Sequence, residues 1–487
     1  MTSITSSYLE HSAASPDSIA LQTADEQITY KQWSDSVFQT ANWFSSYKDA
    51  GSKTAAILLP NGIPFLQLFA GAASAGWIVC PLDIRWGKED LNARAEIGNP
   101  SMIITTEEYA DQLVSVQTKI ILLEEFLKQT EQYGTSPPAI KEDPPFYMGF
   151  TSGSTGNPKA FVRSHGSWVE SFACNKTDFQ MKEQEQVLIP GPLIHSHFLY
   201  GAISTLYLGG TVFLLEKYSA EKLLAGLNHN PVTVVYLVPT MIEGLIKNKY
   251  QVNKPVTIIS SGAKWEPDSK SRVNTVFPEL RMYEFYGASE LSFVTVLSHE
   301  DNFKYPGSVG RPCHNVKIQI RKKDGSIAPA GEIGKIYVKS NMIFLGYKHT
   351  RGSMIASETD SNGWMSVDDM GYLDKNGFVY LAGRENHMMI YGGINIFPEE
   401  IESVLLQHPL VEQAAVVGLK DSYWGEIVTA AIKGQAAKKE LKSLCREKLS
   451  SYKVPRRWFF IEDMPLTSSG KIARAAVKKL AEEYVYD

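Results

Sequence analysis

The segment Tyr147-Met-Gly-Phe-Thr-Ser-Gly-Ser-Thr-Gly-Asn-Pro-Lys159 runs from an apolar stretch into a loop rich in glycine and hydroxyl residues. Glycines let a backbone approach a ligand closely and turn its N–H groups inward. The hydroxyl side chains add hydrogen-bond donors, and Lys159 adds a mobile positive charge. The segment therefore predicts a strand at Phe146–Phe150 and, after it, a loop that wraps a polyphosphate.

This loop differs from the common mononucleotide P-loop, which requires a glycine immediately before the lysine and Ser or Thr after it. Here Pro158 precedes Lys159 and Ala160 follows it. A flexible polar linker is the alternative interpretation. A linker needs neither the Pro-Lys ending nor a strand that leads in, so the loop favours phosphate binding.

Length, composition and charge are those of a globular protein with several domains. The chain has 487 residues, of which 44% are hydrophobic and 21% charged, enough for large cores. Its formal net charge is −5. Proteins that bind nucleic acids usually carry a basic excess, so we expect no nucleic-acid partner.

The cysteines and the apolar segments predict a cytoplasmic protein. Cys80, Cys174, Cys313 and Cys445 lie far apart and form no C-x-x-C pair, which disfavours structural zinc and a disulfide framework. No signal peptide is predicted at the N-terminus. The most apolar region, Phe65–Leu82, is interrupted by a glutamine, glycines and a proline. It predicts a buried helix and a strand, and no transmembrane segment.

Strand and helix patterns alternate up to about residue 260, which predicts parallel sheets covered by helices. The clearest helix is Gln32–Ser45, with its apolar residues on one face. From about residue 305, short strands separated by glycine-rich turns predict a small antiparallel or barrel-like module. A compact α+β piece follows Gly383-Arg384, and its helix at 398–406 begins with proline and acidic residues.

Two further strands end in residues that suit a nucleotide. Ser260-Ser-Gly-Ala263 could support a flat ring on its backbone, although a tight turn is an equal alternative. Tyr283–Glu290 ends a short strand, where Tyr286 offers a stacking face and Glu290 a hard oxygen ligand for Mg²⁺. Taken alone, such a glutamate is more often a solvated acid.

Three more polar groups are ambiguous when each is taken alone. His195 and His197 form an H-x-H pair that could bind a metal on a strand, but no third ligand is evident, so lining a carboxylate-substrate pocket is favoured. The pair Asp368-Asp369 could hold a ribose diol or form a polar β-turn. Lys471 lies in a glycine-flanked loop, where a lysine is normally a solvated surface charge.

Together and in this order, the segments resemble the adenylate-forming (ANL) superfamily, which contains acyl-CoA synthetases, nonribosomal adenylation domains and beetle luciferases. The resemblance spans nearly the whole chain, and the ordered set of motifs is highly specific. The motifs are Phe150–Lys159, Tyr286–Glu290, Gly363–Asp374, Gly383-Arg384, Gly393–Glu402 and Gly470-Lys471.

The resemblance implies an α/β fold with two domains. A large N-terminal domain at 1–384 would hold two parallel-type αβ sheets and the small barrel-like β module, with the ATP and acyl sites. A small mobile α+β C-terminal domain at 387–487 would carry Lys471, with a hinge near 385–387.

The resemblance also implies a role for each motif residue. The phosphates of ATP would be held by Thr151, Ser152, Gly153, Ser154, Thr155, Gly156 and Lys159. The adenosine and α-phosphate would contact Ser261, Gly262, Ala263, Tyr286, Gly287, Ser289, Asp369 and Arg384. Mg²⁺ would be bound by Glu290 and Thr155, and the pantetheine arm of CoA would pass Gly392 and Gly393. Lys471 and Glu290 would be catalytic, with His195 at the acyl pocket.

Several positions depart from the pattern of the family. Ser289 stands where threonine is common and keeps the hydroxyl. Val367-Asp368 replaces Thr-Gly before the ribose aspartate, so Asp368 competes with Asp369, which the spacing to the next glycine favours. Other departures are at Ala160, Asn386 and Ile390. These changes bear on domain closure more than on the chemistry.

The resemblance implies an AMP-forming acyl-CoA synthetase that uses ATP, Mg²⁺ and CoA. Segment Pro192–Tyr200 offers no acid to pair with an α-ammonium group, which disfavours amino-acid substrates. The expected apolar and aromatic pocket walls predict a fatty or aryl acid, and hence a role in fatty acid metabolism. These wall residues are His195, Phe198, Tyr200, Tyr236 and Phe285.

Two other functions stay open at this point. One is a stand-alone adenylation enzyme that loads a carrier protein, and the other is a catalytically silent nucleotide-binding homologue. The oligomeric state, monomer or homodimer, is equally open.

Overall fold

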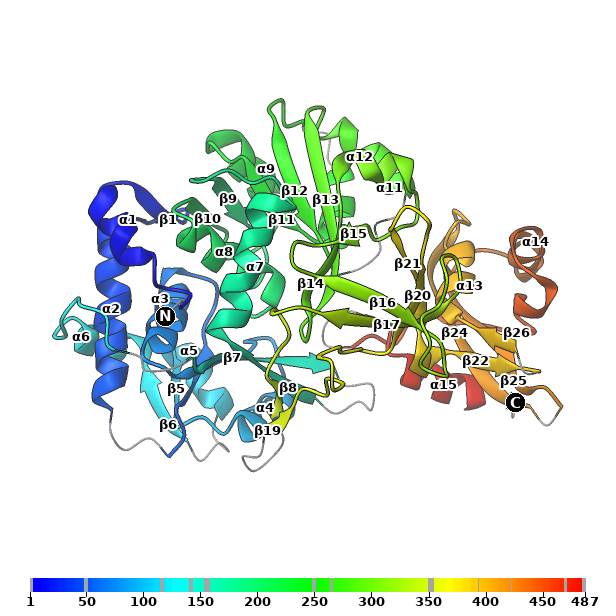
Figure 1. The fold of residues 1–487 in the computed structure, drawn as a ribbon, viewed down its shortest axis with the longest axis horizontal. Helices are drawn as coiled ribbons and strands as arrows, with labels where there is room; N and C mark the ends of the chain where they lie inside the picture. The colour runs from blue at the N-terminus through cyan, green and yellow to red at the C-terminus, as the bar shows by residue number, and fades with distance from the viewer. Residues whose placement is uncertain are drawn as a thin grey trace. The chain divides into compact units, whose positions relative to one another are not determined.

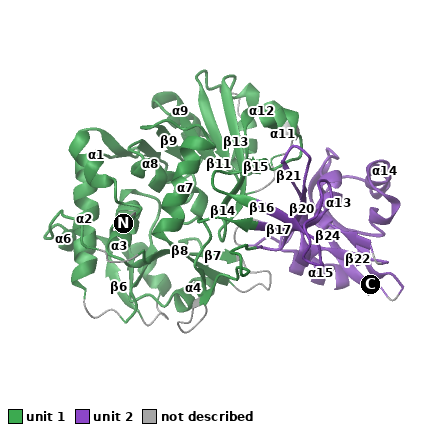
Figure 2. Cartoon of the chain, viewed as in Figure 1, with its two compact units in different colours: residues 1–151, 158–317, 338–365 green, residues 152–157, 318–337, 366–487 purple. Residues whose placement is uncertain are grey.

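The computed structural model describes residues 3–47, 51–113, 118–139, 143–152, 158–247, 251–262, 265, 267–348, 354–392, 394–421, 423–467 and 471–483. Its contacts divide the chain into two compact units (Figure 2). Unit 1 comprises residues 1–151, 158–317 and 338–365, and unit 2 comprises residues 152–157, 318–337 and 366–487. The domain boundary near 385–387 stays a prediction.

Unit 1 contains two large sheets (Figure 1). The first has the order β19 (Met354–Ala356), β18 (Gly346–Lys348), β8 (Pro158–Ser164), β7 (Pro145–Ser152), β4 (Ile78–Pro81), β3 (Thr54–Leu58), β5 (Met102–Thr105) and β6 (Lys119–Leu122). Its strands pair in parallel from β7 to β6. At the other end, β18 pairs antiparallel with β8 and β19.

The second sheet has nine strands. Their order is β15 (Arg311–Pro312), β14 (Ser292–Leu297), β13 (Leu280–Ala288), β12 (Val256–Ser260), β11 (Val234–Leu237), β9 (Gln186–Ile189), β10 (Thr211–Leu214), β1 (Ile19–Gln22) and β2 (Gln27–Thr29). The strands from β13 to β1 pair in parallel. The predicted parallel sheets are therefore confirmed, with antiparallel strands at their ends.

Helices connect these strands, as crossovers between parallel strands require. They are α1 (Tyr8–Ala14), α2 (Tyr30–Ser46), α3 (Ile63–Ser74), α4 (Lys88–Gly98), α5 (Glu107–Ala110), α6 (Leu123–Thr130), α7 (His165–Thr177), α8 (Ser196–Tyr207), α9 (Ala220–His229), α10 (Pro239–Ile246), α11 (Pro267–Arg272) and α12 (His299–Lys304). Short 3₁₀ turns lie at Asp111–Leu113 and Val273–Thr275. Every residue of β3 and β11 is buried, because sheets of this kind have both faces covered.

The helix predicted at 32–45 is α2, which begins two residues earlier than the pattern indicated. The reason is a capping box at its N-terminus. The Thr29 hydroxyl accepts from the Gln32 N–H, and the Gln32 side chain accepts from the Thr29 N–H at 2.8 Å. This reciprocal pair satisfies two N–H groups that a helix start leaves open.

Unit 2 contains the predicted small β module and the C-terminal α+β piece. The module is a four-stranded sheet in the order β16 (Lys317–Arg321), β17 (Gly334–Lys339), β20 (Asp369–Leu373) and β21 (Val379–Arg384); residue 317 of β16 and residues 338–339 of β17 are assigned to unit 1. The second sheet joins β23 (Ile394–Ile396), β22 (Met389–Tyr391), β25 (Gly425–Gly434) and β24 (Val411–Asp421), and β26 (Arg457–Phe460) pairs with β25. Helices α13 (Pro398–Leu405), α14 (Lys438–Lys448) and α15 (Arg474–Glu483) accompany it, with 3₁₀ turns at Glu385–His387 and Ser451–Lys453.

In the described part of the chain, no helix has both the length and the apolar character needed to cross a bilayer. The apolar region at 65–82 forms most of α3 and then β4, as its pattern predicted. Both elements belong to the core of unit 1, where Phe65 and Phe69 are almost fully buried.

We expect the stability of unit 1 to fall as the pH drops from about 6.5 toward 4. Burial lowers the pKa of His165 and of His197 to about 4. Because these folded values are depressed, the unfolded chain takes up protons first. The full stability is therefore present above the unfolded pKa and is lost below it. Urea unfolding should show a loss of roughly 1 kcal/mol per pH unit for each histidine. A His165→Gln variant with an unchanged pH dependence would contradict this explanation.

Candidate functional site

The predicted phosphate loop connects β7 to β8. Thr151 and Ser152 end β7, and Lys159 is the second residue of β8. The four residues Gly153, Ser154, Thr155 and Gly156 lie outside the described residues. The Lys159 Nζ lies 5.4 Å from the centre of the Tyr347 ring, a distance at which a cation is attracted by an aromatic face.

The predicted adenine-binding residues follow or belong to two neighbouring parallel strands. Ser261 and Gly262 come directly after β12, whereas Ala263 lies outside the described residues. Tyr286 and Gly287 lie on β13, which pairs with β12 in parallel. The carboxyl ends of these strands therefore meet at one edge of the sheet, where open α/β sheets usually bind ligands.

A tight turn between β13 and β14 carries Ser289 and Glu290. It requires a glycine at 287, because a Cβ there would lie 2.0 Å from the Ser292 carbonyl oxygen. Two residues from other segments also donate hydrogen bonds to backbone carbonyls of this turn. The Phe344 N–H donates to the Glu290 carbonyl at 2.8 Å, and an Arg163 Nη1–H donates to the Ser289 carbonyl at 2.8 Å.

The carboxylate of Glu290 accepts a hydrogen bond from the Tyr347 hydroxyl at Oε1. Burial lowers the pKa of Arg163 to about 10, and the nearby charge of Glu290 opposes that shift. The described residues contain no group of three or more His, Cys, Asp and Glu side chains that could hold a metal. Glu290 still suits Mg²⁺, because that ion is usually held by one or two carboxylates together with phosphates and water.

The two histidines of the H-x-H pair belong to the start of a helix. His195 is the N-cap of α8, and His197 lies in its first turn. The backbone turns helical directly after His195, whose carbonyl accepts from the N–H groups of Phe198 and Leu199. Residues i and i+2 share a face on a strand but not on a helix, so the two histidines do not form a pair that faces one way.

Aromatic rings surround His197. Its ring centre lies 5.0 Å from that of Phe198, 5.2 Å from Tyr236 and 5.6 Å from Phe285. His197 Nε2 lies 3.1 Å from the Leu237 carbonyl oxygen. A carbonyl only accepts, so Nε2 carries the proton. Since burial lowers the pKa of His197 to about 4, this ring is uncharged at neutral pH. Three of the predicted pocket residues therefore gather around a neutral histidine.

Tyr200, also predicted in the pocket wall, is buried, and both its hydroxyl and its ring contact other residues of unit 1. Its hydroxyl donates to the Ser171 carbonyl at 3.0 Å, and its ring contacts Phe293 edge-on at 5.0 Å.

In unit 2, the two competing aspartates have different partners. Asp369 pairs across the sheet with Arg384, whose Nε–H donates to Asp369 Oδ1 at 3.0 Å. Asp368 instead accepts from Lys335 Nζ at 3.0 Å. Its backbone φ is +65°, a left-handed conformation that aspartate tolerates. Asp369, rather than Asp368, therefore pairs with Arg384, and the role of both residues at the ribose stays a prediction.

The predicted hinge residues form the 3₁₀ turn Glu385–His387. Lys335 Nζ is 2.5 Å from Glu385 Oε2, and Asn386 Nδ2 donates to Asp368 Oδ2 at 3.5 Å. The Glu385 N–H donates to the Asp368 carbonyl at 2.8 Å. Lys335 thus connects Glu385, in this turn, with Asp368.

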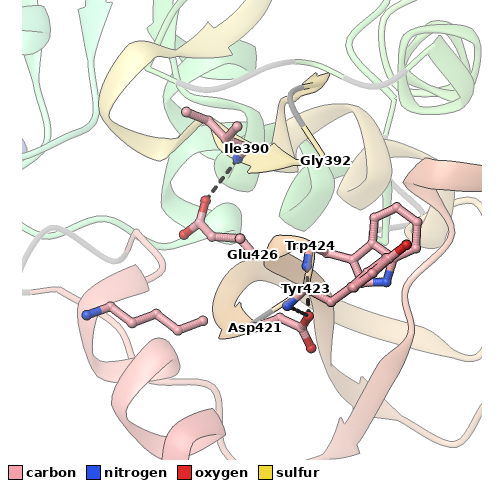
Figure 3. Close-up of a pocket in the computed structure, with 8 residues that line it drawn as sticks. Ile390, Gly392, Asp421, Tyr423, Trp424 and Glu426 are labelled. Carbon is pink, nitrogen blue, oxygen red and sulfur yellow. Dashed lines mark hydrogen bonds between the residues drawn. The ribbon is translucent and has the colours of Figure 1, made fainter.

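The predicted pantetheine residue Gly392 lines a surface pocket of about 840 Å³ in unit 2. The others lining the pocket are Ile390, Lys420, Asp421, Tyr423, Trp424, Gly425 and Glu426. Figure 3 shows Asp421 Oδ1 accepting from the N–H groups of Tyr423 and Trp424, and Glu426 accepting from the Ile390 N–H. Gly393 lies outside the described residues.

Gly392 needs to be a glycine. Its φ is +55°, and a Cβ would lie 3.1 Å from the Trp424 ring. Trp424 in turn stacks on Tyr391 at 4.6 Å, with an interplanar angle of 9°. In this pocket Gly392 therefore lies next to the stacked rings of Tyr391 and Trp424.

Lys471 is joined to Thr467 through its own backbone atoms. Its N–H donates to Thr467 Oγ1 at 3.2 Å, and its carbonyl accepts from the Thr467 N–H at 2.7 Å. An antiparallel bridge joins Leu466 to Ile472. The backbone around the lysine is thus held independently of its side chain.

Sequence patterns missed several residues that contact the predicted site. Some of them are far along the chain from the residues they contact, and the others belong to no predicted motif. They are Tyr347, Arg163, Lys335 and Trp424. Tyr347 and Glu290 are 57 positions apart, so no local spacing could have connected them. Near Tyr347, the sequence offers only the Gly346-Tyr347 pair as a local signal.

The chain is similar to known proteins over almost its full length. Residues 9–348 match the family model described as AMP-binding enzyme, and residues 400–471 match that of the AMP-binding enzyme C-terminal domain. An acyl-CoA ligase of Bacillus subtilis (strain 168), YhfT, described as uncharacterized, is 51% identical over 483 residues, which cover 99% of each chain.

Two solved structures of o-succinylbenzoate CoA synthetase (MenE) from Bacillus subtilis are 26% identical to this chain. One, in complex with the acyl-adenylate intermediate OSB-AMP, has a TM-score of 0.88 with 98% of each chain covered. The other, in complex with ATP and magnesium ion, has a TM-score of 0.86 and covers 97% of this chain and 98% of that one. On the strength of the family models and the 51% identical relative, the chain belongs to the AMP-binding enzyme (ANL) superfamily and is an AMP-forming acyl-CoA ligase.

Proposed function

We propose that this acyl-CoA ligase activates a monocarboxylic acid with an apolar fatty or aryl group. The observation that supports this proposal is the ring cluster around His197, made by Phe198, Tyr236 and Phe285. Aromatic faces and edges favour apolar groups. A neutral His197 offers no positive charge for a second carboxylate.

The first half-reaction joins the acid to AMP. A carboxylate oxygen attacks the α-phosphorus of ATP, the bond from that phosphorus to the bridging oxygen breaks, and pyrophosphate leaves. We assign the phosphates to the loop that ends at Lys159, the adenine to Ser261, Gly262 and Tyr286, and the ribose to Asp369. Mg²⁺ bound at Glu290 would supply positive charge to the phosphate oxygens. Lys471 would offer its ammonium group to the charge that develops as pyrophosphate departs.

The second half-reaction transfers the acyl group to CoA. The thiol sulfur attacks the acyl carbon of the adenylate, its proton is released, and AMP leaves with the oxygen that joined it to the acyl group. We assign the pantetheine arm to the pocket beside Gly392. Trp424 and Tyr423 offer ring faces there, and the Tyr423 side of the pocket is open, with that residue 82% exposed.

We also propose that the chain has domains at 1–384 and 387–487, with a hinge at 385–387 that exchanges Lys471 for the Gly392 segment between the half-reactions. The contacts of the 3₁₀ turn support this proposal. Besides the backbone hydrogen bond from Glu385 to Asp368, the side chains of Asn386 and Glu385 are held by polar groups, at Asp368 and Lys335. These side-chain contacts are partly exposed, and such contacts exchange for water at a modest cost in free energy.

An Asn386→Pro variant should keep one half-reaction and lose the other. Proline fixes its own φ and restricts the residue before it, so the turn can no longer change conformation. Pyrophosphate exchange measures the first half-reaction, and CoA-dependent release of AMP from supplied acyl-adenylate measures the second. Asn386→Ala, which removes only the side-chain hydrogen bond, is the control. Normal turnover in the proline variant would contradict the hinge.

The reaction is proposed to take place in the cytoplasm. All four cysteines are free and buried in the structure, which suits a reducing compartment.

The substrate proposal is tested by measuring pyrophosphate release with straight-chain acids, aryl acids and dicarboxylic acids, each with and without CoA. Neutral apolar acyl groups should give the highest kcat/KM. If 2-succinylbenzoate or another acid with a second carboxylate is preferred, the proposed substrate class is wrong, because the pocket must then contain a positive charge. If no acid releases pyrophosphate, the proposed adenylation site itself is contradicted.

A further inference from the structure

Tyr347 contacts two residues of the predicted ATP site at once. Its hydroxyl donates to Glu290 Oε1, and its ring lies 5.4 Å from the ammonium nitrogen of Lys159. Glu290 follows a strand of the nine-stranded sheet, whereas Lys159 lies on a strand of the eight-stranded sheet. Both contacts lie within unit 1.

The sheet register explains the contact with Lys159. Strand β18 pairs antiparallel with β8, and Tyr347 lies opposite Phe161. Alternate residues of a strand share a face, so Lys159 and Phe161 point to the same side of β8 as Tyr347 does on β18. Diagonal neighbours of this kind are within reach of long side chains. The ring of Tyr347 is therefore placed beside Lys159 by backbone pairing.

The contact with Glu290 is supported by a second set of backbone contacts. The Phe344 N–H donates to the Glu290 carbonyl at 2.8 Å. The buried Arg163 donates to the Ser289 carbonyl at 2.8 Å and to the Met342 carbonyl at 2.5 Å. The segment that carries Tyr347 and the turn that carries Glu290 are thus joined at three places.

We propose that Tyr347 is a positioning residue that orients the magnesium ligand Glu290 and the phosphate-loop residue Lys159 as one unit. This inference rests on the proposed ATP site. Since the hydroxyl hydrogen is bonded to Oε1, it fixes the rotation of the carboxylate, and Oε2 is the oxygen left to face a metal. Hydrogen bonds to a metal ligand of this kind commonly set its metal affinity.

The alternative is that Tyr347 only ties the two sheets together. The two roles differ in their dependence on Mg²⁺. A tie between sheets affects stability and nucleotide binding equally with and without the metal. Orientation of Glu290 affects only the part of nucleotide affinity that Mg²⁺ provides.

The test measures binding of α,β-methylene-ATP by calorimetry, with Mg²⁺ and with EDTA. This analogue cannot be cleaved at the bond that adenylation breaks, so turnover does not contribute. Tyr347→Phe removes the hydroxyl and keeps the ring. It should reduce the Mg²⁺-dependent gain in affinity by about 10-fold or more, with the affinity in EDTA unchanged. Tyr347→Leu removes the ring as well and should also weaken binding in EDTA, because Lys159 loses its aromatic neighbour.

Tyr30→Phe is the matched control. It removes a buried hydroxyl that donates to the Gly210 carbonyl at 2.7 Å, at a place that contacts none of the proposed site residues. It should lower the melting temperature and leave the Mg²⁺-dependent gain intact. If Tyr347→Phe keeps the Mg²⁺-dependent gain in affinity, or loses affinity equally with and without Mg²⁺, the inference about Tyr347 is wrong. The proposed magnesium site would not be affected by that result. A wild-type protein that binds the analogue no better with Mg²⁺ than in EDTA would overturn the proposed magnesium site and this inference together.

Discussion

Replacing Lys471 with alanine is expected to slow acyl-adenylate formation by about 10²–10³-fold. Negative charge accumulates on the α-phosphate and on the departing pyrophosphate in this step, and a positioned ammonium group stabilises it more than water does. The substitution should leave the fold intact, because the hydrogen bonds of residue 471 to Thr467 use backbone atoms of the lysine. Pyrophosphate exchange in the presence of a substrate acid measures the effect.

Two controls separate this role from a general electrostatic effect. Lys479→Ala removes an exposed lysine from α15 in the same region and should change the rate less than about twofold, since exposed charges contribute little. Thioester formation from supplied acyl-adenylate should be largely retained in Lys471→Ala. Equal losses in both half-reactions would show that the lysine has no role specific to adenylation.

Local patterns predicted the elements that precede each motif. The apolar run at 146–150 lies within β7, and the small residues after β12 follow a buried strand, as expected. These predictions succeeded because strand propensity, burial and turn chemistry all act within a few residues of one another. The same local reasoning did not decide the secondary structure at His195 and His197. A short polar stretch after Pro190-Gly-Pro192 carries too little periodicity to distinguish the first turn of a helix from a strand.

Contacts between distant segments could not be predicted from patterns. Arg163 and Met342 are 179 positions apart, and Asp368 meets Lys335 across the small sheet. Each pair depends on which strands become neighbours, and strand order is decided by the packing of the whole unit. The choice between Asp368 and Asp369 shows this most clearly. Asp369 begins β20 opposite Arg384, whereas Asp368 precedes the strand in a left-handed conformation, so only the sheet register shows which one meets Arg384.

A largely buried ion pair fixes the helix that follows Lys471. Arg474, the first residue of α15, donates to both carboxylate oxygens of Glu402, at 2.5 and 2.6 Å. It also donates to the Val416 carbonyl at 3.0 Å. Glu402 in turn accepts from the Val416 N–H at 2.6 Å. Burial on its own lowers the pKa of Arg474, but the hydrogen bonds and charge of Glu402 outweigh it, so the pKa is raised.

Glu402→Ala should therefore destabilise unit 2 by about 3 kcal/mol, because it leaves a largely buried guanidinium, 19% exposed, with Glu399 as its remaining carboxylate. Glu400→Ala is the matched control, since Glu400 lies on the same helix and pairs with Lys453 at 2.6 Å, but is 43% exposed. That variant should lose less than about 1 kcal/mol. Urea unfolding of the two variants measures the difference. Equal losses in the free energy of unfolding would show that burial does not determine what the Glu402–Arg474 pair contributes to stability. Arg474 would then be held in place by the packing of α15 against β24 alone.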